Sequence, residues 1–109
     1  MPSTQGSPVQ VKPAAATAET LLLATQDVLI STIPVANVGG SSDTYRIWVR
    51  LNGEMSVSDK NYIAFDIPLP TGVAVGFTLG MLIGAGDRIE VQSLNGSLAF
   101  NAFFMKVTL

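Results

Sequence analysis

The chain has 109 residues, a formal net charge of −2, and neither cysteine nor histidine. This length gives room for one domain with one core, and the two missing residue types exclude disulfides, thiol chemistry, and histidine as general base or metal ligand. The six basic residues are spread singly along the chain, so no basic stripe supports binding to a nucleic-acid backbone.

Hydrophobic residues make up 48% of the chain and charged residues only 13%, whereas an ordinary globular domain carries about 25% charged residues. So little charge favours an oligomer or a subunit of a larger assembly, in which part of the apolar surface is covered. The start at Met1–Ser3 lacks the basic and apolar regions of a signal peptide, and no apolar run reaches the ~20 residues that cross a bilayer. We therefore expect a soluble protein with no membrane partner.

Residues 1–18 are expected to form an extended N-terminal arm, because prolines and small polar residues recur there and cannot build a packed layer. The alternatives are an untethered terminus and an arm laid across a neighbouring subunit, whose contacts would then include Pro8, Val9 and Val11. Residues 19–109 are expected to form a single β-sandwich domain.

From Glu19 onward, β-type runs follow one another every ~10–12 residues, with turn signals between them. No segment keeps a helical period long enough for a crossover helix, which argues against a parallel α/β sheet. The expected fold class is all-β: an antiparallel β-sandwich, jelly-roll-like or Ig-like, of about seven or eight strands. The expected strands lie in Thr20–Ala24, Val28–Val38, Thr44–Gly53, Tyr62–Ile67, Val73–Leu79, Asp87–Gln92 and Leu98–Thr108.

The stretch Thr44–Gly53 alternates between two faces and ends in the turn signal Asn52-Gly53. Its outer face carries Trp48 between Arg46 and Arg50, and tryptophan and arginine are enriched in interface hot spots. We expect these three residues to form a contact surface; the alternative is that Trp48 packs under the arm or an edge loop. The apolar face, expected to line the core, comprises Tyr45, Ile47, Val49 and Leu51.

Local patterns carry further predictions. Pro34 cannot donate to a β ladder, so it marks an edge or a bulge within its run. The polar segment Glu54–Lys60 fits one short helical turn with Ser56 or Ser58 as its cap. Asp66, inside a strand, either faces the exterior or, if buried, must be hydrogen-bonded or paired with an arginine (Arg46, Arg50 or Arg88). Alternation also places Ile63, Phe65 and Ile67 on one face, and Val73, Val75, Phe77 and Leu79 on a core face.

The last strand is apolar on both faces, so it needs cover beyond its own sandwich. An inter-subunit contact supplies that cover most simply, and the N-terminal arm is the alternative. We expect Phe100 and Phe104 to belong to this contact. The two faces are Leu98, Phe100, Ala102 and Phe104 on one side, and Ala99, Phe103, Met105 and Val107 on the other.

The eight acidic residues show no catalytic pattern. Most lie at expected turns, where aspartate caps backbone donors, and no two are marked out as the facing pair that a glycosidase needs. Asp43, Asp59 and Asp87 do not match a calcium-binding loop, and the glycines of Gly80–Gly86 form no nucleotide-binding motif. We therefore expect no enzyme activity, no metal and no cofactor.

Several segments between Leu21 and Leu109 resemble a group of small β-sandwich virion structural proteins of tailed bacteriophages. The most specific are K-N-Y-I-A-F-D-I-P-L-P at Lys60–Pro70 and A-G-D-R-I-x-V at Ala85–Val91, with N-G-S-L-A-F-N at Asn95–Asn101 following them. These segments are turn-and-strand patterns, and the N-terminal arm lies outside the resemblance.

The resemblance implies a non-enzymatic subunit that associates with itself, most often as a homotrimer. It further implies a capsid decoration (cement) protein at the capsid surface of the virion, assembled in the host cytoplasm and bridging subunits of the major capsid protein. The alternative is a tail, fibre or baseplate component that contacts other virion proteins or a host surface glycan. A carbohydrate-cleaving enzyme is the third and least favoured class.

Overall fold

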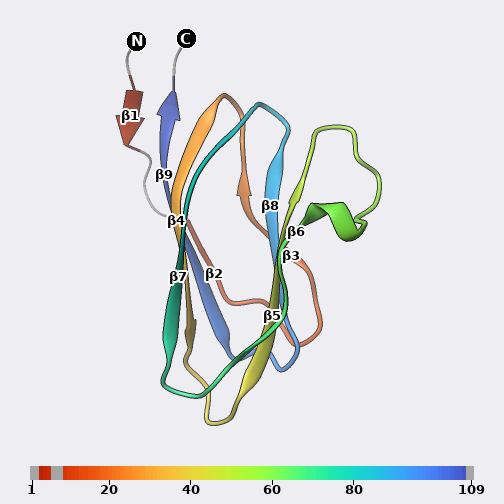
Figure 1. The fold of residues 1–109 in the computed structure, drawn as a ribbon, viewed down its shortest axis with the longest axis vertical. Helices are drawn as coiled ribbons and strands as arrows, with labels where there is room; N and C mark the ends of the chain where they lie inside the picture. Colours follow the sequence, from red (N-terminus) through yellow and green to blue (C-terminus); the bar gives the residue numbers. More distant parts are fainter. Residues whose placement is uncertain (1–2, 6–8, 108–109) are drawn as a thin grey trace.

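A computed structural model of the chain describes residues 3–5 and 9–107, which form two packed antiparallel β-sheets (Figure 1). The expected all-β sandwich is confirmed. A single 3₁₀ turn, η1 (Asp59–Asn61), interrupts the strands of the described part. The strands are β1 (Ser3–Gln5), β2 (Val9–Val11), β3 (Glu19–Leu23), β4 (Val28–Asn37), β5 (Asp43–Arg50), β6 (Tyr62–Leu69), β7 (Ala74–Ile83), β8 (Arg88–Ser93) and β9 (Leu98–Val107).

The strand order distinguishes between the two sandwich topologies that the sequence left open. The first sheet runs β1–β9–β4–β7 with β2 also on β9, and the second runs β3–β8–β5–β6. Four strand pairs are therefore nested along the chain, so that each pair encloses the next. The pairs are β2 with β9, β3 with β8, β4 with β7 and β5 with β6. A long antiparallel ribbon folded over into two sheets gives this order, which is that of a jelly roll.

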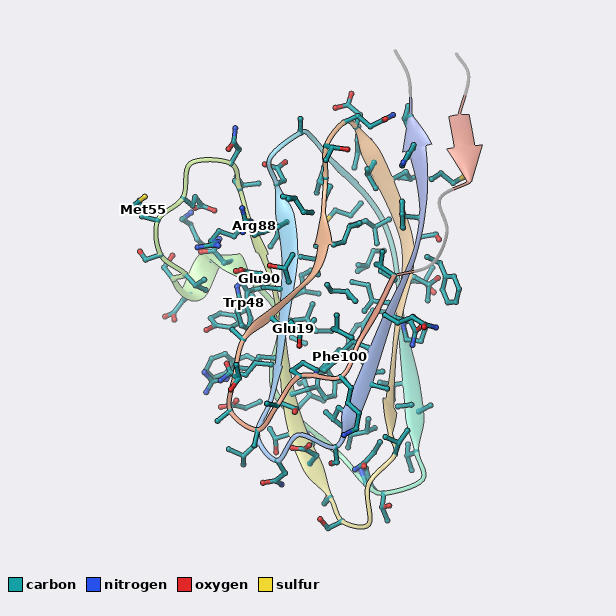
Figure 2. The ribbon with its side chains drawn as sticks, turned by 180° about the vertical axis from the view of Figure 1, so that it is seen from behind. Glu19, Trp48, Met55, Arg88, Glu90 and Phe100 are labelled. Carbon is teal, nitrogen blue, oxygen red and sulfur yellow. The ribbon has the colours of Figure 1, made fainter. Side chains whose placement is uncertain are left out.

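The core lies between the two sheets and is built from alternate residues of their central strands. Tyr45 of β5 is 1% exposed and meets two rings of the opposite sheet edge-on, Phe77 at 6.1 Å and Phe100 at 6.2 Å between ring centroids. Figure 2 shows Phe100 inside the sandwich. Burying one such side chain contributes about 1.5–3 kcal/mol. The inner face expected for β5 is confirmed at Tyr45 and Ile47, whereas Leu51 lies beyond the strand and is exposed.

The described part of the N-terminal segment lies along its own chain. β2 pairs with β9, so that Val9 stands opposite Ala102 and Val11 opposite Phe100. Further on, Pro13 is fully buried and the Ala16 N–H donates to the Ser93 carbonyl at 2.8 Å. Residues 9–11 thus supply the first strand of the jelly roll, which the sequence did not indicate because so short a run is not recognisable as a strand. Pro8, one of the expected arm contacts, lies outside the described residues.

Strand β6 contains a bulge that inverts its alternation. Asp66 has a positive φ of 51°, and the register changes from Ile67 opposite Tyr45 to Ala64 opposite Ile47. Bulges of this kind turn the side chains that follow them to the other face. The prediction of one shared face for Ile63, Phe65 and Ile67 is therefore wrong: Ile67 shares the core side with Tyr45, while Phe65 contacts Arg46 on the outer side.

Pro34 lies in a central strand rather than at an edge, so that part of its prediction is wrong. It stands opposite Gly76 of β7, and the bulge in β4 falls earlier, between Ile30 and Thr32 in its pairing with β9. On the other side, the β4–β9 register has no partners for Ile33 and Pro34, as expected where a residue cannot donate. The edge strand is β7, which leaves Val75 36% exposed although it was expected in the core.

The short helical turn is confirmed as η1, with Ser58 at its N-cap position. The Ser58 N–H donates to Asn61 Oδ1 at 2.9 Å, and Asn61 Nδ2 donates to the Val49 carbonyl at 2.7 Å. The buried asparagine therefore ties the 3₁₀ turn to the end of β5.

Candidate interaction surfaces

The outer face of β5 holds the first candidate surface, but its tryptophan is covered. Trp48 is only 4% exposed, although its position on the outer face was expected to leave it in contact with water. Its neighbours in the sheet are Tyr62 on β6 and Glu90 on β8. The indole Nε1 donates to Glu90 Oε1 at 2.8 Å, and the Tyr62 ring stands edge-on at 5.7 Å. Trp48 is therefore packed, but its cover comes from the two neighbouring strands rather than from the arm or an edge loop.

Both flanking arginines have carboxylate partners on the neighbouring strands. Arg50 Nη2 lies 3.1 Å from Glu90 Oε2, so Glu90 links the arginine to Trp48. Figure 2 shows Glu90 beside Trp48. Arg46 donates twice to Asp66, from Nε at 2.6 Å and from Nη2 at 3.1 Å, and lies 4.3 Å from the Phe65 ring centroid. This hydrogen-bonded pairing lowers the pKa of the Asp66 carboxyl and raises the pKa of the Arg46 guanidinium. Asp66 thus faces the exterior and is paired, a combination of the two expectations.

Arg46, Trp48 and Arg50 therefore belong to a network in which Asp66 and Glu90 accept hydrogen bonds from all three side chains. A partner that used them would have to replace existing charge-assisted bonds, which limits what it gains. The sequence could not show Glu90 and Asp66 as members, because they come from two other strands whose register depends on the Asp66 bulge.

A hollow of about 480 Å³ lies beside this network, between the N-terminal segment and the second sheet. Its polar side chains come from three strands. One of them, Asp66, has a positive φ at the bulge and accepts a hydrogen bond from Arg46. The lining residues are Ala16, Thr44, Arg46, Asp66, Gln92, Ser93 and Leu94.

The second candidate surface is the outer face of the first sheet, and its distinguishing property is the absence of charge. Lys106 is the one charged residue in the described strands of this sheet. Leu29 of β4 is in register with Leu82 of β7 on one side and Met105 of β9 on the other, which forms an apolar row across three strands. Leu82 is 60% exposed and Phe103, further along β9, is 39% exposed. The second sheet instead carries Glu19, Asp43, Arg46, Arg50, Asp66, Arg88 and Glu90.

The other expected contact residues do not gather at either surface. Phe100 is fully buried and Phe104 is 5% exposed, so both lie in the core of their own chain. Val9 and Val11 pack against that core at the edge of the first sheet. The face of β9 that does reach the surface is the other one, with Phe103 and Met105, which the alternation of the sequence had already separated from the inner face.

Two of the aspartates considered for calcium, Asp43 and Asp87, accept hydrogen bonds from groups of their own chain. Asp43 is 2% exposed and accepts hydrogen bonds from the N–H groups of Thr44, Asn95 and Ser97 and from the Ser97 hydroxyl. Burial by itself raises the pKa of this carboxyl, but the four hydrogen bonds lower it below its ordinary value. Asp87 accepts from the N–H groups of Asn52 and Gly84. Across residues 3–5 and 9–107, no three acidic side chains gather into a metal-binding group.

The class of protein that the structure defines is a jelly-roll β-sandwich with one charged and one nearly uncharged outer face. No helix in the described ranges has the length and apolar character to cross a membrane. Compared with known proteins, the chain matches no family model, and no curated protein matches it.

Proposed function

We propose that the chain is a structural subunit of a tailed-bacteriophage virion, and specifically a capsid decoration protein that bridges and stabilises subunits of the major capsid protein. The observation that carries the proposal is the uncharged outer face of the first sheet, with Leu29, Leu82, Phe103 and Met105 across its strands. Apolar faces of this kind mark protein–protein contacts. The resemblance of Lys60–Pro70 and Ala85–Val91 to small phage virion proteins supplies the identity of the partner.

The size of this face suits a contact of moderate strength. Strands of ten residues span ~33 Å at ~3.3 Å per residue, and four strand positions at ~4.8 Å span ~19 Å, so the face covers ~600 Å². A contact that buried it would cover ~1,200 Å² on the two partners together, at the lower end of specific interfaces. In this proposal a single copy binds weakly, and the sum over many copies on a capsid resists the outward pressure of packaged DNA.

The two sheets divide the work in this arrangement. The first sheet lies on the capsid, while the second sheet, with its ion pairs Arg46–Asp66 and Arg50–Glu90, faces water. Charged pairs that are already satisfied keep that outward face hydrated without attracting further copies. The proposed role is non-enzymatic.

The second candidate is a tail, fibre or baseplate component that contacts a host surface glycan, and the hollow beside Arg46 favours it. Thr44, Asp66 and Gln92 line that hollow with hydroxyl, carboxylate and amide groups, which suit the hydroxyls of a sugar. The number of copies per virion separates the two candidates, because a decoration protein is present in hundreds and a tail component in a few to tens.

The test is binding to purified capsids that lack this subunit. The wild-type chain should bind saturably, and Phe103→Asp should abolish binding, because it places a charge in the middle of the uncharged face. Leu94→Asp is the matched control, since Leu94 is 60% exposed in a loop outside that face. No saturable binding by the wild type, or equal binding by Phe103→Asp, would refute the decoration role.

A further inference from the structure

Strand β7 forms an open edge of the first sheet, and its bulge at Leu79–Gly80 leaves residues 74–78 without the usual protection. It runs for ten residues, Ala74–Ile83, without a charged residue or a proline, and in the described part of the chain it pairs with β4 alone. Native edge strands are commonly kept from pairing by lysine, proline, bulges or shortness. The other edges have such protection: β6 has Pro68 and the Asp66 bulge, β3 has five residues, and β1 and β2 have three each.

Apolar side chains next to the β7 edge are exposed because no neighbouring strand covers them in the described part of the chain. Val75 points to the core side, because it stands opposite the fully buried Val35, yet it is 36% exposed and Val73 is 40% exposed. Figure 1 shows β6 and β7 passing on the viewer's side of the sandwich. One additional strand along β7 would cover the exposed valines.

The backbone of β7 is straight enough to accept that strand over residues 74–78. The β4–β7 register is regular from Ala74 opposite Ala36 to Thr78 opposite Thr32, and it shifts only beyond Thr78, where Gly80 has a φ of 63°. The Asn37 N–H donates to the Val73 carbonyl at 3.0 Å, so this carbonyl points toward β4, whereas the Val73 N–H donates to the Pro70 carbonyl. Because carbonyls alternate in direction along a strand, those of Ala74, Gly76 and Thr78 point to the open side.

We propose that the occupant of this edge is a second copy of the chain, paired antiparallel through residues 74–78 about a two-fold axis at Gly76. Gly76 then stands opposite its own copy, and Ala74 stands opposite Thr78. This register keeps the apolar inner side of both strands on the same face of a continuous sheet. Because the strand is uncharged, it meets itself without like-charge repulsion.

The geometry is that of a closed dimer, and the area is that of a weak contact. An antiparallel pair of identical strands is isologous, so it ends at two copies, in contrast to the trimer that the phage resemblance implies. The paired segment of five residues is ~17 Å long and, with two sheets ~10 Å apart and their side chains, ~20 Å wide, which gives ~340 Å² per copy. The total of ~680 Å² lies below the ~1,200 Å² of standard interfaces, so the dimer should be weak and should form reversibly. This inference does not rest on the virion role.

Cysteine substitution tests both the contact and its register, because the chain has no cysteine of its own. Opposite residues in an antiparallel pair have Cα atoms ~4.5–5.5 Å apart, within the ~4.4–6.8 Å that a disulfide spans. Under mild oxidation Gly76→Cys should form a covalent dimer by itself. Ala74→Cys and Thr78→Cys should form one only when mixed, since each is ~13 Å from its own copy. Leu94→Cys, at an exposed loop position, is the control and should stay monomeric on a denaturing gel.

Sedimentation of the unmodified chain supplies the second measurement. The wild type should form a dimer reversibly as its concentration rises. Thr78→Lys gives the edge the lysine that commonly protects such strands, and it should raise the dissociation constant at least tenfold with unchanged thermal unfolding of the monomer. Leu94→Lys should sediment as the wild type does. A monomeric wild type, a dimer or trimer that Thr78→Lys leaves intact, or cross-linking no stronger at Gly76→Cys than at Leu94→Cys would overturn the proposal. If a capsid segment occupied the β7 edge instead, the wild type would be monomeric and Thr78→Lys would lose capsid binding. This result would likewise overturn the proposal of a second copy.

Discussion

Replacing Trp48 by alanine is expected to destabilise the fold strongly. Trp48 is 4% exposed, packs edge-on against Tyr62, and donates to Glu90. Truncating a buried tryptophan costs about 3–5 kcal/mol, and we expect about 3 kcal/mol because a single layer of side chains covers the indole. At about 4–8 °C per kcal/mol for a domain near this size, the midpoint of thermal unfolding should fall by about 12–24 °C.

The sequence suggested a contact surface at Trp48, whereas its burial predicts that the substitution lowers stability. Far-UV circular dichroism during urea unfolding measures the loss, and Trp48→Phe is the control. Phenylalanine keeps a ring against Tyr62 but removes the donor to Glu90, so it should cost only about 1–2 kcal/mol. If Trp48→Ala lost less than about 1 kcal/mol while assembly or capsid binding was abolished, the indole would act at an interface and the reasoning from burial would be refuted.

Three further predictions concern the N-terminal segment, the buried aspartate and the bulge. Deleting residues 1–12 removes β2 from β9. The unfolding midpoint in urea should therefore fall markedly, and a hydrophobic dye should bind to the uncovered edge. An unchanged midpoint would show that these residues are a dispensable arm. Asp43→Asn should cost about 1–3 kcal/mol at pH 7, since an amide offers one acceptor oxygen where the carboxylate serves four donors. Because the pKa of Asp43 is lowered in the fold, its stabilisation is present above the ordinary value of 3.8 and disappears as the pH falls through the folded-state pKa, so titrated unfolding curves of the two proteins should converge in acid. Asp66→Gly should be more stable than Asp66→Ala by about 1 kcal/mol, because both lose the Arg46 pair but only alanine meets the cost of a positive φ; equal unfolding free energies would show that the bulge relaxes.

The sequence predicts those parts of the fold that local alternation determines. Tyr45 and Ile47 face the core as expected, and Ser58 begins the short helical turn, because both depend on residues that are close in the chain. Predictions failed where one strand's environment is set by another. Alternation cannot show that Asp66 adopts a left-handed conformation, nor that β7 ends a sheet and leaves Val75 half-covered.

The candidate surfaces show the same division. The sequence placed Trp48 correctly on the outer face of its strand. Whether the side chain of an outer residue is exposed to solvent, however, depends on its cross-strand neighbours. Here those neighbours are Tyr62 and Glu90, and both are large enough to cover an indole. The sequence also identified the apolar last strand, yet it assigned the contact to Phe100 and Phe104 rather than to Phe103, since nothing local shows which of two apolar faces points inward.

The uncharged sheet, by contrast, leaves a signal in the sequence that depends on topology for its meaning. The strands without charge, VLISTIPVAN and AVGFTLGMLI, are separated in the chain by two strands that carry Arg46, Arg50 and Asp66. Taken singly, each resembles an ordinary buried strand. The nested pairing of a jelly roll sends β4, β7 and β9 to one sheet and β3, β5, β6 and β8 to the other, so charge that looks unevenly scattered along the chain becomes a difference between two faces. A sheet whose three long strands hold only Lys106 has lost the protection that charge gives against association, and the face and the β7 edge of that sheet are therefore where contacts with other proteins should be sought.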